Sequence, residues 1–175
     1  MSGWSWPIPE IESSRRSPLP WQWFVGLSSV ALGLQTQLPT IVPGLVLVNL
    51  PFVTTLNLML CCRSAVSTML LGALIGCVYD GLTHGPVGLQ GIVYTICGYL
   101  FAQVGPRLRR DHALELGSFF GAAYLAHELL LGVVRYVVVS AGEGTDLSLT
   151  LALTAVHAGA GLFLFTMLNK AAGKP

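Results

Sequence analysis

Charged side chains are scarce in this sequence. Lysine and arginine together number nine and the acidic residues eight, so charged residues make up only 10% of the 175, whereas soluble domains carry roughly 25%. Apolar residues reach 53%, and the mean hydropathy is +0.69. This composition indicates one polytopic membrane domain without an added soluble catalytic domain. The net charge of +1 does not favour nucleic acid as a partner.

Catalytic and metal-binding patterns are also missing. The sequence contains no nucleophile elbow, Walker loop, HExxH motif or paired-carboxylate motif. Its four cysteines form neither a CxxC motif nor a ligand spacing with histidine; they are Cys61, Cys62, Cys77 and Cys97. We therefore expect a protein that is not an enzyme and that holds no metal or other cofactor.

Prolines, glycines and charges divide the chain into six apolar segments of about 20 residues, the length that crosses a bilayer. The predicted helices are Trp21–Leu38, Leu45–Cys62, Ser64–Leu82, Val87–Val104, Leu114–Val139 and Leu147–Leu168. The expected fold is thus an all-α bundle of about six transmembrane helices over residues 21–169. Polar tails at 1–20 and 170–175 flank this domain.

The second predicted helix has two alternative forms. Pro43 and Pro51 interrupt it, and proline removes a backbone donor and bends a helix. The alternative to a full span is a short kinked helix that begins near Pro51, preceded by a segment at Thr40–Leu50 that lies along the membrane surface.

Basic residues indicate the orientation of the spans. Outside the predicted helices they are Arg15, Arg16, Arg63, Arg107, Arg109, Arg110, Lys170 and Lys174. With six spans, all of them fall on one side, and the loops on the other side, near 37–44, 83–86 and 140–146, contain none. Short loops rich in basic residues stay cytoplasmic, so both termini are expected in the cytoplasm. Removing the second span would place the basic residues on both sides of the membrane.

Small and polar residues recur every four positions along the third predicted helix. They are Ser64, Thr68, Gly72, Gly76 and Asp80. Such positions share one helix face, and small residues there let another helix approach closely. Packing inside the bundle is the favoured interpretation, and contact with a partner protein is the alternative. Gly85, Pro86 and Gly88 follow and are typical of a tight hairpin turn.

The fifth predicted helix carries a second polar stripe, made of Gly117, Gly121, Tyr124, Glu128 and Arg135. An ionised residue near the bilayer centre costs at least about 2.5–3.5 kcal/mol, so it normally faces the interior and has a partner. Similar depth predicts a buried pair of Asp80 with Arg135. His127 and His157 are candidate partners of Glu128. We favour a structural network over a proton or ion path.

A pattern of about thirty residues surrounds the predicted hairpin. It comprises Leu71–Gly76, Tyr79–Gly81, Gly85–Leu89, Tyr94 and Gly98–Leu100, with the basic cluster Arg107–Arg110 behind it. This pattern resembles the central signature of the rod shape-determining protein MreD family. His84 stands where the family often has serine, and Val87 replaces leucine. The length and the six-helix layout extend the resemblance over about residues 20–170.

The resemblance implies a multi-pass protein of the bacterial inner membrane that acts as a non-catalytic scaffold in cell elongation and cell-shape control. MreD proteins associate with MreC and work with RodA, its class B penicillin-binding partner and cytoplasmic MreB filaments in peptidoglycan synthesis. The structural or interaction candidates are Gly72, Gly76, Asp80, Gly85, Pro86, Gly88, Glu128 and Arg135.

The family fold is thought to be similar to that of the vitamin-binding components of energy-coupling-factor transporters. A small-molecule-binding transporter component is therefore the alternative function. Those components usually present an Ala-x-x-x-Ala docking pattern on the first helix, which Gly26–Gly33 lacks. Their ligand loops also tend to be longer than Thr83–Pro86. Both differences favour the scaffold.

Overall fold

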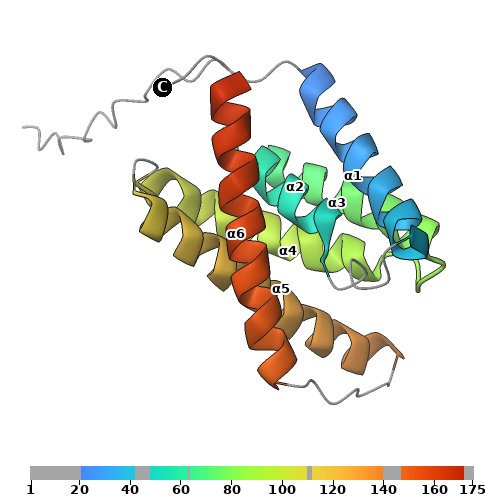
Figure 1. Ribbon diagram of the computed structural model, residues 1–175. Helices are drawn as coiled ribbons and strands as arrows, with labels where there is room; N and C mark the ends of the chain where they lie inside the picture. The colour runs from blue at the N-terminus through green and yellow to red at the C-terminus, as the bar shows by residue number, and fades with distance from the viewer. Residues whose placement is uncertain (1–20, 42–47, 63, 110–111, 140–146, 172–175) are drawn as a thin grey trace, which may run out of the picture.

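The computed structural model describes residues 21–41, 48–62, 64–109, 112–139 and 147–171. Within these ranges all regular structure is helical (Figure 1). The elements are α1 (Trp21–Ile41), α2 (Leu50–Met59), α3 (Ala65–Thr83), α4 (Leu89–Val104), the 3-10 turn η2 (Gly105–Arg107), α5 (Ala113–Val139) and α6 (Leu147–Ala171). The predicted all-helical class is confirmed, and most predicted helix ends lie within three residues of the observed ones.

Three of the described helices are long and apolar enough to cross a bilayer. They are α3, α5 as far as Val138, and α6 as far as Lys170. By contrast, α4 has 16 residues and α2 only ten, and α1 is not among the helices that meet both criteria. The structure therefore supports a helical membrane protein, although three of the six predicted spans do not meet these criteria by themselves. The tail at 1–20 and the loop at 140–146 lie outside the described residues.

α2 corresponds to the shorter of the two predicted alternatives. Asn49 precedes it and accepts a hydrogen bond from the Phe52 N–H at 3.0 Å, while Pro51 occupies the first turn. Asparagine is a favoured N-cap, and proline is tolerated where its missing N–H would have no helical partner. Ten residues extend only about 15 Å. Residues 51–60 are all buried, and α2 packs against α1, α3, α4 and α6. Most of the predicted surface segment before it, residues 42–47, lies outside the described residues.

α3 and α4 form the most extensive helix pair in the described structure. At Gly76 of α3, an added Cβ would lie 2.6 Å from the Gln90 carbonyl oxygen of α4. At Gly98 of α4, it would lie 2.7 Å from the Thr68 carbonyl oxygen. The Thr68 hydroxyl also donates to the Gly98 carbonyl at 3.0 Å. Gly72 likewise faces the backbone of α4 without room for a side chain. The predicted small-residue stripe thus packs inside the bundle.

An aromatic core lies where α2, α4 and α5 meet. The Phe52 ring contacts Tyr94 edge to face at a centroid distance of 5.5 Å, and contacts Tyr124 in the same manner at 6.5 Å. Such edge-to-face pairs stabilise the fold beyond the effect of their buried area.

α6 crosses α5 (Figure 1). Gly161 of α6 lies directly against the ring of Phe120, where a Cβ would come within 2.6 Å of Cδ1. This glycine allows α6 to lie close to α5.

The close contact of α3 with α4 predicts different responses at two glycines of α3. Gly76→Ala should destabilise the fold by about 1–3 kcal/mol, because the new methyl overlaps the backbone of α4. Gly81→Ala is the matched control, since a Cβ there meets nothing within 4 Å; it should be neutral or stabilising by up to about 1 kcal/mol. Thermal unfolding in detergent measures both, and equal midpoints would contradict the tight contact.

Candidate functional site

Asp80 lies near the C-terminal end of α3, where its side chain is only 2% exposed. Its carboxylate faces the N-terminus of α4. Oδ2 accepts hydrogen bonds from the N–H groups of Gly88 at 2.9 Å, Gln90 at 3.0 Å and Gly91 at 3.4 Å. The first N–H groups of a helix have no partner within it, and the positive end of the helix dipole attracts a carboxylate. Asp80 therefore caps α4 from the preceding helix.

The turn between α3 and α4 depends on residues that tolerate unusual backbone angles. Gly88 has φ 95°, in the left-handed region that glycine adopts without strain. His84 ends α3 with φ 55°, and its N–H donates to the Asp80 carbonyl. Gly85 donates to the same carbonyl at 3.3 Å, and the Pro86 carbonyl accepts from the first residue of α4 at 3.2 Å. Asp80 thus closes the hairpin with both its side chain and its main chain.

The prediction of a buried pair between Asp80 and Arg135 is wrong. The Arg135 side chain is exposed on α5, whereas the Asp80 carboxylate is buried against backbone N–H groups of α4. The prediction rests on similar depth along two helices, and depth does not determine which way a side chain points around its helix. The positive partner of this carboxylate is a helix N-terminus rather than a basic side chain.

A second group of polar side chains lies at the centre of the bundle, and we call it the polar cluster. Its members are Gln35, Asn49, Gln90, Tyr94, Tyr124, His127, Glu128 and His157. They come from α1, the start of α2, α4, α5 and α6. All except Asn49 and Glu128 are less than one tenth exposed. Buried polar groups are costly unless they are hydrogen-bonded, so the contacts within this cluster matter for stability.

Asn49 joins several helices within the polar cluster. Its Oδ1 accepts from the Tyr94 hydroxyl of α4 at 3.1 Å, in addition to capping α2. Its N–H donates to Nε2 of His157 on α6 at 3.0 Å. The next N–H, that of Leu50, donates to Oε1 of Gln35 on α1 at 3.0 Å. Side chains of three helices therefore hold the N-terminus of α2 in place.

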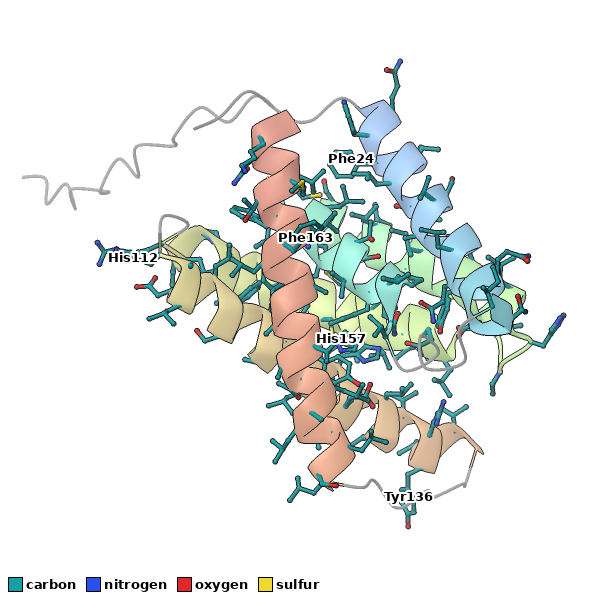
Figure 2. The ribbon with its side chains drawn as sticks, in the orientation of Figure 1. Phe24, His112, Tyr136, His157 and Phe163 are labelled. Carbon is teal, nitrogen blue, oxygen red and sulfur yellow. The ribbon has the colours of Figure 1, made fainter. Side chains whose placement is uncertain are left out.

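His157 bridges α6 and α2 as a neutral imidazole. Its Nε2 accepts from Asn49, and its Nδ1 lies 2.7 Å from the Leu153 carbonyl. A ring that accepts at Nε2 and donates at Nδ1 is the neutral tautomer with the proton on Nδ1. The ring also stacks on Tyr124 at a centroid distance of 3.8 Å. Figure 2 shows the side chain projecting from α6 toward the middle of the bundle.

His127 contacts Gln90 through one ring nitrogen and Glu128 through the other. Nε2 of His127 lies 3.1 Å from Oε1 of Gln90, within hydrogen-bond distance. Nδ1 of His127 lies 3.4 Å from Oε1 of Glu128, a separation within ion-pair range. His127 is thus the histidine in direct contact with Glu128.

Three members of the polar cluster were not among the residues predicted from the sequence: Gln35, Asn49 and Gln90. The Asn49-Leu50-Pro51 order is a helix-start signal that points to a capping asparagine. Gln90 interrupts an otherwise apolar run, and polar residues at membrane depth normally face a partner. No comparable signal distinguishes Gln35 from the other glutamine and hydroxyl residues of α1.

The described residues include no group of three or more histidine, cysteine or acidic side chains arranged to hold a metal ion. The four cysteines are free thiols, and Cys97 is fully buried against the core. A buried thiol of this kind behaves as a small apolar side chain. The chemistry that the described geometry carries is therefore helix capping and hydrogen bonding.

The cap on α4 predicts a graded loss of stability at Asp80. Asp80→Ala should destabilise the fold by about 1.5–3 kcal/mol, because it removes charged hydrogen bonds to several N–H groups. Asp80→Asn retains one acceptor oxygen and should lose less. Thr83→Ala in the same helix is the control, since its hydroxyl bonds only within α3. Thermal unfolding in detergent tests this order, and an Asp80→Ala midpoint equal to that of the control would contradict the cap.

Comparison with known proteins gives one family. The sequence model of the rod shape-determining protein MreD matches residues 17–157. This range includes α1 to α5, the capped hairpin and the first part of α6. Searches of curated proteins and of solved structures found no match. Because the matched range covers most of the chain, the protein belongs to the MreD family of rod shape-determining membrane proteins.

Proposed function

We propose that this protein is a non-catalytic scaffold of the bacterial cell-elongation complex that binds MreC and helps to position peptidoglycan synthesis. The observation that carries the proposal is the MreD family match over residues 17–157. RodA, its class B penicillin-binding partner and cytoplasmic MreB filaments are the further components with which the scaffold would act. The proposed location is the inner membrane.

The use of polar groups inside the bundle supports a scaffold. The Asp80 carboxylate accepts hydrogen bonds from backbone N–H groups at the N-terminus of α4. His157 is hydrogen-bonded through both ring nitrogens. Residues placed in this way hold helices in register. The interior side chains of Tyr94, His127 and His157 are at most 1% exposed, so the centre of the described bundle is occupied by the chain's own residues. This favours the scaffold over a vitamin-binding transporter component.

We further propose six membrane passages with both termini in the cytoplasm. The one-sided distribution of basic residues supports this topology. It requires α2 and the residues before it to return the chain across the membrane, because otherwise Arg16 and Arg63 would lie on opposite sides. η2 extends α4 by three residues, which lengthens an otherwise short passage. Residues 1–20 and 170–175 are then cytoplasmic tails.

Cysteine labelling tests the topology. In a background without natural cysteines, a membrane-impermeant maleimide applied from outside should modify cysteine at positions 84 and 143 and spare position 109. The reason is that positions 84 and 143 lie in loops without basic residues, whereas position 109 lies in a basic cluster. Labelling at 109 from outside would exclude the proposed orientation.

Co-purification tests the function. Tagged protein extracted from membranes in mild detergent should retain co-expressed MreC, and an unrelated single-span protein expressed at the same level should be lost. Retention of neither protein, together with a tightly bound small molecule in the purified sample, would reject the scaffold and favour the transporter-like alternative. Mass spectrometry of the purified sample distinguishes these two results.

A further inference from the structure

The N-terminus of α2 is attached to α6 through a hydrogen bond that only a neutral histidine can accept. The Asn49 N–H donates to Nε2 of His157 at 3.0 Å, and a backbone N–H can only donate. The other ring nitrogen, Nδ1, lies 2.7 Å from the Leu153 carbonyl, which can only accept. Nδ1 therefore carries the single proton of the ring, and Nε2 carries none. A second proton on this ring would remove the bond to Asn49.

The surroundings of the ring determine which side of this bond can move. His157 is only 1% exposed, and its ring stacks on Tyr124 of α5 at a centroid distance of 3.8 Å. The ring is thus held in place by α5. By contrast, Val48, Asn49 and Leu50 are only half-buried at the start of α2. When two donors face each other across this contact, the start of α2 is the part that has room to withdraw.

The other attachments at this end of α2 do not respond to pH near neutrality. The Leu50 N–H donates to Oε1 of Gln35 at 3.0 Å, and the Tyr94 hydroxyl donates to Oδ1 of Asn49 at 3.1 Å. An amide does not titrate, and a tyrosine hydroxyl ordinarily loses its proton only near about pH 10. Histidine is the side chain whose ordinary titration lies close to physiological pH. Among the hydrogen bonds described at this helix end, the one to His157 is therefore the pH-sensitive one.

The ionisable groups that face His157 come from α5. They are Tyr124, which stacks on the ring, and His127 and Glu128, which interact with it electrostatically. α2 presents Asn49, which does not ionise, and the charged Lys170 of α6 lies in the last turn of that helix. Glu128 attracts a proton on His157, whereas a charged His127 repels it. These two effects oppose each other, so the bond to Asn49 is the contact that distinguishes the neutral ring from the charged one.

We propose that His157 is a pH-sensitive latch: the neutral ring holds the N-terminus of α2 against α6, and protonation releases it. The released state binds one proton more than the latched state. The ratio of latched to released protein therefore falls as the pH falls, by up to about tenfold per pH unit once the ring titrates. This device goes beyond the proposed scaffold function and does not depend on the identity of the partner protein.

Substitution of the ring tests the latch through pH dependence. In His157→Gln the amide oxygen can accept from the Asn49 N–H but cannot gain a proton. Thermal unfolding in detergent is measured at about pH 7.5 and about pH 5.5, on either side of the ordinary histidine range. The wild-type midpoint should fall by several degrees on acidification, and the His157→Gln midpoint should fall much less. His112→Gln at the exposed start of α5 (Figure 2) is the control and should keep the wild-type decrease.

Two results of this comparison would overturn the latch. One is an equal decrease in the wild type and in His157→Gln. The other is a decrease that disappears in His127→Gln and persists in His157→Gln, because the titrating group would then be the histidine that contacts Gln90 and Glu128.

Nitrogen NMR of the wild type tests the same proposal without a substitution. With isotope-labelled protein, the His157 ring should show a protonated Nδ1 and an unprotonated Nε2 at neutral pH. Acidification should protonate Nε2, and the signal of the Asn49 amide should shift over the same pH range. A proton on Nε2 at neutral pH, or a protonation that leaves the Asn49 amide unchanged, would show that His157 is not a latch. Neither measurement uses MreC, so a failed latch leaves the scaffold function standing.

Discussion

The carboxylate of Asp80 at the N-terminus of α4 is the interaction on which the hairpin depends. The open N–H groups of that helix and its dipole provide a positive site within a low-dielectric interior. Because the carboxylate belongs to α3, its hydrogen bonds to the N–H groups of α4 fix the position of one helix relative to the other. The glycine contacts further along the pair need this same register: Gly76 must lie opposite Gln90, and Gly98 opposite Thr68. A shift of one helix would bring side chains into the space that these glycines leave.

The polar cluster extends this constraint to the rest of the bundle. α2 is too short to define its own position across a bilayer, yet Asn49 and Leu50 bind acceptors on α1 and α6, and Tyr94 of α4 donates to Asn49. Buried hydrogen bonds of this kind have few alternatives in an apolar surrounding. Stability in this interior therefore favours one arrangement of helices. A protein that presents a partner with a surface of constant shape benefits from such rigidity.

Much of the fold follows from local patterns in the chain. The ends of α3, α5 and α6 could be predicted because apolar length and flanking polar residues mark them. The hairpin could be predicted because His84, Gly85, Pro86 and Gly88 cannot continue a regular helix. The pairing of Asp80 could not, because its partner is a set of backbone N–H groups, and these carry no side-chain signature. Asn49 and Gln90 join the polar cluster through long-range contacts that no local spacing encodes.

The sequence by itself determined a helical membrane protein, a tight hairpin after α3 and a family resemblance centred on that hairpin. These properties depend on composition, apolar length and turn chemistry, which are local. Only the tertiary structure decided that Asp80 caps α4, that Arg135 is exposed and that His127 faces Glu128. Those outcomes depend on how each helix is rotated about its axis, and that rotation is set by packing against several neighbours at once.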